Sequence, residues 1–388
     1  MNSSCPICDV SAVPLEISAT NLPQFHVISS STRLGREHFG SLNLGWCPSC
    51  DHYFNMSVVP DTPNDLRFTT NQSVSGEMSA RHDSLSNYLT SYKRDPGLVL
   101  DIGSGSGGYA RALSKCGHRV IALEPTLNIA CSTNSYELVV DVWPSKLLEG
   151  VLFDLIICVQ VLEHLPDPVI ALLKIIQSLD HEGLAYVEVP SGDWVFFNSS
   201  PIDIHIPHRH YFTQRSFHQM LENVGAELID VRPVLSGRDT GYLIRKGFGT
   251  TRKVSRTPLA SRHTGVLERI RFLNSHVIDE NQSVAVYGAN AGCQAFLGWT
   301  SDFSVSMVVD DTPAYWGHDV YSNNSRIRVL EPTLQHLHEI DHVIIASYNH
   351  DSLINNKLKQ LGYTGLISTL RPTSVASDQL QSLFASLT

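Results

Sequence analysis

The fold of this chain is decided by the stretch LVLDIGSGSGGYA, residues 98–110. A short apolar run ends in a glycine-rich turn that begins at Asp101, and a helical pattern follows from Tyr109 to Cys116. Glycines let a ligand approach the backbone closely because they carry no side chain. The stretch therefore predicts a strand, a nucleotide-binding turn and a helix.

Strand and helix patterns alternate downstream of this turn. The apolar runs are VIALEP at 120–125, LVVDV at 138–142, FDLIICVQ at 153–160 and LAYVEVP at 184–190, with helical patterns near 127–133 and 168–179. Such alternation predicts an α/β fold, in which helices cover both faces of a parallel sheet. Ligands of these sheets bind at the carboxyl ends of the strands. Glu124 ends the second strand, where a carboxylate can accept both hydroxyls of a ribose.

In these motifs, residues 98–190 resemble a class I S-adenosylmethionine-dependent methyltransferase with a Rossmann-like sheet. The matching stretches are LDIGSGSG at 100–107, ALEP at 122–125, the acidic Asp141, FDLI at 153–156 and VLEHLPD at 161–167. The resemblance implies that the glycine turn holds the methionine part of the cofactor, Glu124 its ribose, and Asp141 with Val142 its adenine. The cofactor residues it assigns are Asp101, Gly103, Ser104, Gly105, Gly107, Glu124, Pro125, Asp141, Val142 and Gln160. A glycine turn alone also fits NAD, so a Rossmann-type sheet without S-adenosylmethionine is the alternative.

Four of the eight cysteines form two C-x-x-C pairs near the N-terminus, CPIC from Cys5 to Cys8 and CPSC from Cys47 to Cys50. In a reducing compartment two such pairs predict one tetrahedral zinc site with four thiolate ligands. Two disulfides or free thiols are the alternative. Four thiolates leave no open position on zinc, so we expect a structural Zn²⁺ and no catalytic metal.

A segment rich in aromatic residues and histidine follows the strand at 184–190. It reads SGDWVFFNSSPIDIHIPHRHYFT, residues 191–213, and has the composition of a loop. Loops at the carboxyl ends of strands supply substrate-binding and catalytic groups. The candidates for acid–base chemistry are His205, His208, His210 and Tyr211, because imidazoles titrate near neutral pH. The alternative is that these histidines only satisfy backbone groups within a compact loop.

A second alternation of strands and helices begins after a weakly patterned boundary at 247–263. It contains the turn GANAG at 288–292, and Asp310 follows 22 residues after Gly288, as a ribose-binding acid does. The pattern predicts a second parallel sheet. Asn290 stands where a glycine normally lets a pyrophosphate approach, so we do not expect tight dinucleotide binding here.

The whole chain resembles the three-domain C-methyltransferases that act on nucleotide-linked deoxy keto-sugars. Besides the central motifs, the matching stretches are CPIC, CPSCDH, SARH at 79–82, VYGAN at 286–290, VDDTPA at 309–314 and IIASYN at 344–349. The resemblance implies a zinc module at 1–62, a methyltransferase domain at 63–250, and a Rossmann-like substrate-binding domain at 251–388 that lacks a cofactor of its own. It also implies that this third domain closes over the nucleotide end of the substrate.

The resemblance further places the catalytic base at His208, which removes a proton next to a carbonyl. His164, His205 or Tyr211 then stabilises the enolate oxygen, and the carbanion takes the methyl group. Two positions depart from the family, since His205 and Pro207 stand where it has Tyr and Glu. The alternatives are therefore methylation of oxygen or nitrogen on another small polar or nucleotide-linked substrate, and a zinc-containing RNA methyltransferase.

The bulk composition agrees with an enzyme of small molecules. The 388 residues carry a net charge of -10, which disfavours a nucleic-acid partner because such partners need clustered Lys and Arg. The sequence has no apolar run near the length of a membrane span. The N-terminal stretch MNSSCPICDV lacks a secretory pattern, so we expect a cytoplasmic location. The sequence leaves the oligomeric state open.

Overall fold

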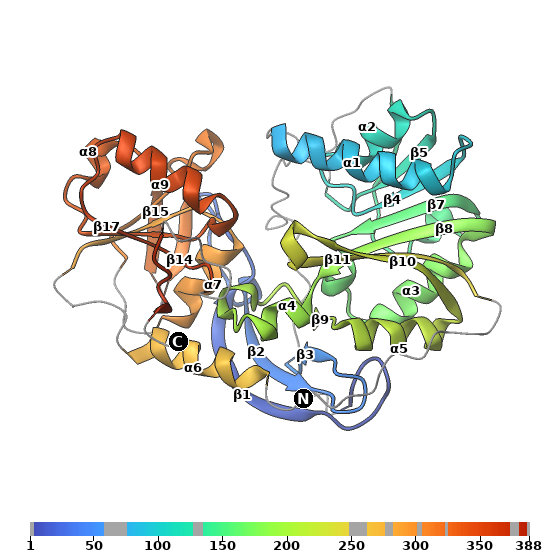
Figure 1. The fold of residues 1–388 in the computed structure, drawn as a ribbon, viewed down its shortest axis with the longest axis horizontal. Helices are drawn as coiled ribbons and strands as arrows, with labels where there is room; N and C mark the ends of the chain where they lie inside the picture. The colour runs from blue at the N-terminus through green and yellow to red at the C-terminus, as the bar shows by residue number, and fades with distance from the viewer. Residues whose placement is uncertain are drawn as a thin grey trace.

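The computed structural model describes residues 4–57, 76–126, 135–247, 262–275, 282–300, 305–322, 325–372 and 380–385. Two lobes stand side by side, and strands from the N-terminal part of the chain run beneath and between them (Figure 1). The described α-helices are α1 Gly76–Tyr92, α2 Gly108–Lys115, α3 Pro168–Gln177, α4 Gly192–Phe197, α5 Gln214–Val224, α6 His263–Ser275, α7 Ala291–Trp299, α8 Leu334–Leu337 and α9 Asp351–Gln360.

The methyltransferase-like lobe is built on a mixed sheet in the order β10-β11-β8-β7-β4-β5-β6. Its strands are β4 Leu98–Ile102, β5 Arg119–Leu123, β6 Glu137–Val139, β7 Phe153–Val159, β8 Leu179–Pro190, β10 Ala226–Val234 and β11 Asp239–Lys246. The five strands from β8 to β6 are parallel, whereas β11 runs antiparallel to both of its neighbours. The predicted parallel sheet is thus extended by an antiparallel pair that the sequence analysis did not identify.

Strand β7 shows why this sheet carries helices on both faces. Its run FDLIICV is almost wholly buried, as expected for a strand covered on two sides. Leu155 and Ile157 pack into the core with α1 and α2, while Ile156 and Cys158 pack into the core with α3 and α5. Successive side chains point to opposite faces of a strand, so the side chains of this one apolar run pack against the helices on both faces of the sheet.

The helices that flank the site begin and end at favourable capping residues. The Asp167 carboxylate accepts a hydrogen bond from the Ile170 amide at 2.9 Å at the start of α3, and Pro168 occupies its first turn. Thr213 caps α5 in a capping box with Ser216, and Gly225 ends it in the left-handed conformation at φ 65°. Helix α5 therefore begins directly after the histidine-rich segment and fixes where that segment ends.

The N-terminal sheet includes a strand from the histidine-rich segment. Its order is β1-β2-β3-β9, with β1 Val13–Pro23, β2 Phe39–Trp46, β3 Tyr53–Asn55 and β9 His210–Tyr211. The expectation of a loop throughout 191–213 is therefore corrected, because this segment contains α4, a 3-10 turn at Pro201–Asp203 and β9. Apolar residues such as Phe196 and Ile204 are buried and order the segment by packing.

The third lobe has a sheet in the order β14-β15-β13-β12-β16-β17. Its strands are β12 Val284–Tyr287, β13 Met307–Val309, β14 Asp319–Ser322, β15 Ser325–Leu330, β16 His342–Ile345 and β17 Leu366–Thr369. All pairs are parallel except the edge pair of β14 with β15. This agrees with the predicted second parallel sheet.

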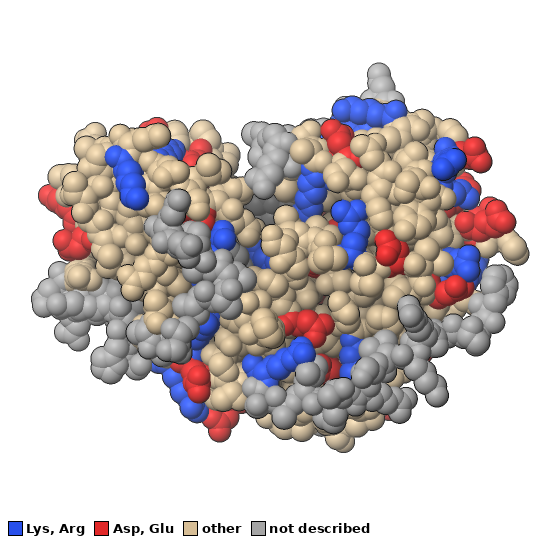
Figure 2. Space-filling model, in the orientation of Figure 1, with Lys and Arg blue, Asp and Glu red and all other residues tan. Residues whose placement is uncertain are grey.

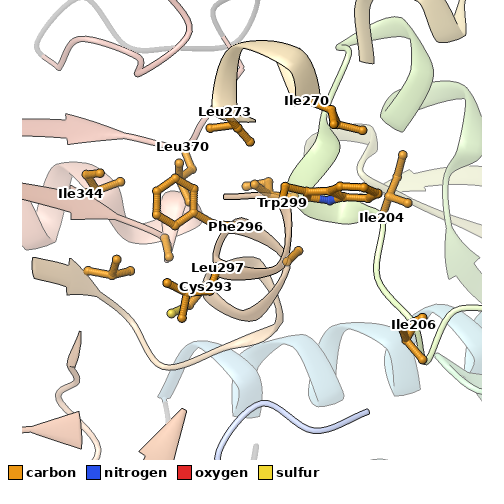
Figure 3. Close-up of a cluster of buried hydrophobic side chains, with 14 of the residues drawn as sticks. Ile204, Ile206, Ile270, Leu273, Cys293, Phe296, Leu297, Trp299, Ile344 and Leu370 are labelled. Carbon is orange, nitrogen blue, oxygen red and sulfur yellow. The ribbon is translucent and has the colours of Figure 1, made fainter. Parts of the chain in front are cut away.

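The histidine-rich segment is anchored in the core of this third lobe. Ile204 lies beside the indole of Trp299 from α7 (Figure 3). Ile206, Phe296 and Leu273 belong to the same buried cluster. The Trp299 Nε1–H donates a hydrogen bond to the Pro201 carbonyl at 2.9 Å. A segment that leaves β8 in one lobe is therefore packed against the other lobe before it returns to β9.

Several expected elements differ in extent from the structure. The strand expected at 138–142 spans only Glu137–Val139, and the helix expected near 168–179 spans Pro168–Gln177. The helix expected near 127–133 and most of the boundary at 247–263 lie outside the described residues. None of the described helices is long and apolar enough to cross a membrane.

Candidate active site

The glycine turn between β4 and α2 has the backbone geometry that only glycine adopts easily. Gly103, Gly105 and Gly107 have φ of 68°, 52° and 73°. The Gly103 amide donates to the Leu123 carbonyl at 2.8 Å, which ties the turn to the end of β5. A Cβ atom at Gly103 would lie 2.4 Å from the Val161 Cγ2 atom. The turn thus packs directly against the residue that follows Gln160.

Buried polar groups face this turn. The Glu124 carboxylate accepts hydrogen bonds from the Gly105 amide at 2.9 Å and the Thr126 amide at 3.0 Å. Pro125 separates Glu124 from Thr126 in the sequence. Asp101 Oδ2 and Ser104 Oγ are buried and have no hydrogen-bond partner within the described part of the chain. Burial raises the pKa of Asp101 to about 7. Unpaired buried polar atoms are costly, so they fit a site that a polar ligand completes.

The remaining predicted cofactor residues lie on neighbouring strand ends. Gln160 has φ 57° at the end of β7, and its buried side-chain Nε2 finds no partner among the described residues. A strained backbone at a strand end is typical of a functional position. Asp141 accepts hydrogen bonds from the Val142 amide and the Ser145 hydroxyl, and Val142 is 50% exposed at the rim. These residues fit the edges of a nucleoside site.

An ionic cluster beside Gln160 was not predicted from the sequence. Arg81 of α1 donates to the Glu188 carboxylate and lies 3.5 Å from the Asp239 carboxylate. Glu188 also accepts from the Tyr186 hydroxyl at 2.6 Å, and its carbonyl accepts from the Gln160 amide. Burial raises the pKa of Asp239 to about 7. The signal in the sequence was the SARH stretch, which carries Arg81 but does not reveal its partners.

A cluster of histidines surrounds a buried glutamate three residues beyond Gln160. Glu163 is fully buried, and its Oε1 lies 3.7 Å from His164 Nε2 and 4.0 Å from His208 Nε2. The His205 and His208 rings meet edge to face with centroids 3.9 Å apart. We call Glu163, His164, His205 and His208 the histidine cluster. The structure thus brings together three of the predicted catalytic residues and adds Glu163.

The electrostatics of the histidine cluster follow from its burial. Removal from water raises the pKa of Glu163 well above its usual range and lowers the pKa of His205 and His208 well below theirs. The Nδ1 atoms of His205 and His208 are buried and lack a hydrogen-bond partner in the described chain. His26 of the N-terminal part stacks on His205 at 6.1 Å between centroids. Burial thus keeps both imidazoles neutral, which leaves a ring nitrogen able to accept a proton, and it makes each ring a weaker base than imidazole in water.

His210 and Tyr211 have structural contacts that revise their predicted catalytic roles. His210 Nδ1 lies 3.2 Å from His52 Nε2, and His210 Nε2 lies 3.0 Å from the Leu165 carbonyl oxygen. The Tyr211 hydroxyl accepts from the His205 amide at 3.1 Å and lies 3.2 Å from the His205 carbonyl oxygen. The polar atoms of both side chains are thereby occupied. They position the histidine cluster and do not face an open site.

The four predicted zinc ligands converge. The Sγ atoms of Cys5, Cys8, Cys47 and Cys50 all lie within 4.8 Å of one another. Cys5 and Cys50 are 3.5 Å apart at sulfur, and Cys8 and Cys47 are 3.4 Å apart, far longer than the ~2.05 Å of a disulfide. Four thiolates around one tetrahedral zinc at ~2.3 Å lie roughly 3.8 Å apart, so the donor set fits this ion.

The two cysteine loops repeat the same turn. Cys5 N donates to the Val10 carbonyl and Cys47 N donates to the His52 carbonyl. The residues before these acceptors, Asp9 and Asp51, have φ of 56° and 64°. Because the second loop continues into β3 and the Thr213 hydroxyl donates to the Asp51 carbonyl, the sulfur cluster braces the strand that carries His210.

The second glycine turn makes hydrogen bonds to the side chains around it. Asp310 Oδ2 accepts from the Ala289 amide at 2.7 Å, and Asp310 Oδ1 accepts from the Thr312 amide, as Glu124 does at the first turn. The Asn290 side chain caps α7 through the Cys293 amide and donates to the Ser347 hydroxyl. That this turn does not hold a dinucleotide tightly stays a prediction.

A family described as a methyltransferase domain matches residues 74–231. No curated protein matches the chain. Among solved structures, the Burkholderia thailandensis 1,6-didemethyltoxoflavin-N1-methyltransferase with bound S-adenosylhomocysteine is similar at 22% identity and a TM-score of 0.37, over 44% of this chain and 79% of that one. The methyltransferase CcbJ from Streptomyces caelestis is similar at 13% identity and a TM-score of 0.37, over 43% and 89%.

The family match covers the glycine turn, Glu124, Gln160 and the histidine cluster. The chain therefore contains a class I S-adenosylmethionine-dependent methyltransferase domain with a Rossmann-like sheet. It is an enzyme that uses S-adenosylmethionine as its methyl donor.

Replacing Gly103 with valine is expected to weaken binding of S-adenosylhomocysteine at least about tenfold in calorimetry, a loss of ~1.4 kcal/mol. The new side chain both strains the backbone and meets Val161 at 2.4 Å. Gly150→Val is the matched control, because Gly150 also has positive φ but no atom within 4 Å of its Cβ position. Equal affinities of the two variants would contradict the placement of the cofactor at this turn.

Proposed function

We propose that the protein methylates a carbon atom of a nucleotide-linked deoxy keto-sugar. The observation that carries this proposal is the histidine cluster. It gathers buried imidazoles around Glu163, which follows the predicted cofactor residue Gln160 by three positions. Carbon next to a carbonyl is acidic enough for such a base to remove its proton, and the resulting enolate needs a polar group at its oxygen.

The chain's own residues divide the work of this reaction. S-adenosylmethionine supplies an electrophilic methyl group, and its sulfur leaves as a neutral thioether when the new carbon–carbon bond forms. His208 or His205 accepts the proton from the substrate carbon at a free ring nitrogen, and the electron pair of that C–H bond becomes the nucleophile. His164 belongs to the same cluster, with its Nε2 atom facing Glu163. Tyr211 and His210 hold the segment in place.

The third lobe supports the nucleotide part of the proposal. Ile204 and His205 of the histidine-rich segment lie beside Gln294 and Trp299 of α7, so the segment borders the third lobe. In Figure 2, several Lys and Arg side chains face the hollow between the two lobes. Positive charge along such a hollow attracts an anionic diphosphate. We therefore place the sugar at the histidine cluster and the nucleotide toward the third lobe.

The proposed zinc site belongs to the same arrangement. The Asn223 side chain of α5 donates to the Ile7 carbonyl at 2.6 Å, and Arg215 donates to the Ser49 carbonyl at 2.5 Å. Both cysteine loops are thus docked on the helix that follows the catalytic segment. A closed four-thiolate zinc has no catalytic task and would stabilise this docking.

Solvent exchange tests the proposed chemistry without requiring turnover. In deuterium oxide, the protein with S-adenosylhomocysteine bound is expected to exchange the proton beside the carbonyl of a nucleotide-linked keto-sugar, because exchange needs the base but not the methyl group. Mass spectrometry of a panel of such sugars measures it. If no member exchanges and a hydroxyl or amine analogue is methylated instead, the enzyme methylates oxygen or nitrogen.

A further inference from the structure

The side chain of Glu163 makes no hydrogen bond within the described structure although it is fully buried. Both of its carboxylate oxygens lack a partner there. A buried carboxyl group without a hydrogen-bond partner destabilises the folded protein, because it has lost its contacts with water and gained none in return. A bound ligand that contacts the Glu163 carboxylate would therefore stabilise the folded protein.

His164 is oriented so that a lone pair faces Glu163. Its Nδ1 lies 2.8 Å from the Pro207 carbonyl oxygen, which can only accept, so Nδ1 carries the proton. Its Nε2 is then unprotonated and points to Glu163 Oε1 at 3.7 Å. Histidine ligands of metals are usually held in this way, with the second ring nitrogen donating to a carbonyl or carboxylate.

His208 presents a second ring nitrogen to the same oxygen. Its Nε2 lies 4.0 Å from Glu163 Oε1, and its side chain is only 13% exposed. The three ligand atoms of Glu163, His164 and His208 all lie within 4.8 Å of one another. His164 is 39% exposed, which leaves one side of this group accessible.

These separations fit a cation better than a shared proton. A proton bridge needs nitrogen and oxygen at about 2.7–3.2 Å, shorter than either distance. Two ligand atoms at 2.0–2.2 Å from one metal ion lie roughly 3.4 Å apart at a tetrahedral angle, a few tenths of an ångström below the observed values. Two imidazoles with one carboxylate suit divalent transition metals such as Fe²⁺, Co²⁺ or Zn²⁺.

The geometry points to a second metal site: Glu163, His164 and His208 bind a divalent transition-metal cation whose open positions take the substrate oxygen next to the reacting carbon. Its role in catalysis rests on the proposed function. The cation stabilises the negative oxygen of the enolate, as a Lewis acid does. His208 then serves as a ligand, and the free ring of His205 becomes the proton acceptor.

Cobalt binding tests this site directly. Purified protein with its zinc retained is equilibrated with Co²⁺, and the metal content of each chain is measured after removal of free ions. We expect one cobalt per chain without loss of zinc, and an absorption spectrum free of thiolate charge-transfer bands. Glu163→Gln and His208→Gln should each weaken cobalt binding at least about a hundredfold, the upper range for changes near a metal.

Two controls separate the site from misfolding and from the proposed reaction. His218→Gln removes a partly exposed histidine on α5 that lies outside the histidine cluster, and it should leave cobalt binding unchanged. Calorimetry should show that Glu163→Gln still binds S-adenosylhomocysteine with unchanged affinity. Cobalt uptake confined to the cysteines, or equal uptake by Glu163→Gln and the native protein, would overturn the metal site. Cobalt binding without any exchange of keto-sugars would instead overturn the proposed substrate and keep the site.

Discussion

Turnover of the His208→Ala variant is expected to fall by roughly a hundred to ten thousandfold, the usual range for loss of a catalytic acid or base. Its affinity for S-adenosylhomocysteine should stay within about twofold, because His208 contacts the histidine cluster and none of the predicted cofactor residues. Methyl transfer under single-turnover conditions and calorimetry measure the two quantities. The same variant should lose deuterium exchange at the substrate carbon.

Comparison with His205→Gln assigns the proton acceptor. If His205 takes the proton, His205→Gln loses exchange but keeps cobalt, whereas His208→Ala loses both. His218→Ala, a change at a partly exposed position on α5, serves as the control and should turn over normally. Retention of full turnover by His208→Ala and His205→Gln would refute a catalytic role for the histidine cluster.

Loss of the proposed zinc is expected to lower the stability of the protein and to reduce turnover, although the zinc does not contact the reacting groups. Native protein should contain about one zinc per chain, and Cys47→Ser should lose it. Structural zinc contributes about 10–16 kcal/mol in small zinc-binding peptides, so even a fraction of this lowers the melting temperature clearly. Turnover should fall more than cofactor affinity, because the second cysteine loop continues into β3, which pairs with β9.

The control for this variant is Cys116→Ser. Cys116 ends α2 and lies outside the sulfur cluster, so its loss should leave both zinc content and melting temperature unchanged. Metal analysis and thermal unfolding of the two variants give the comparison. Absence of zinc from the native protein, together with two disulfides among the four cysteines, would show that the site is not a metal site.

The parts of the fold that could be predicted from the sequence are those whose apolar runs are buried on both faces. Strand β7 was found because its apolar run is continuous, and α2 because a glycine-rich turn precedes it. Strands β10 and β11 were missed. In β10 partly buried and exposed residues are mixed, and the turn that follows it, at Leu235–Gly237, contains a single glycine. The sequence therefore carries little periodic signal there.

The candidate site was predictable only where its residues are close in sequence. The cofactor turn and Glu124 form a local motif, and His205 and His208 lie on one segment. Glu163 meets His208 across 45 positions, and that meeting depends on pairing of β3 with β9 and on packing of Ile204 in the third lobe. Arg81 likewise meets Glu188 through the docking of α1. Such contacts depend on tertiary structure, which one sequence does not display.

Strand β9 is only two residues long, yet it determines which segments must be exchanged together when chimaeric enzymes with this fold are built. It is coded inside the methyltransferase part of the chain but completes the sheet of the cysteine module. In a chimaera that exchanges residues 191–213 alone, β9 would come from one enzyme and its pairing partner β3 from the other. To transfer substrate preference from one enzyme to another, residues 4–57 and 191–213 must therefore be exchanged together. The two segments are separate in the sequence but form one structural unit.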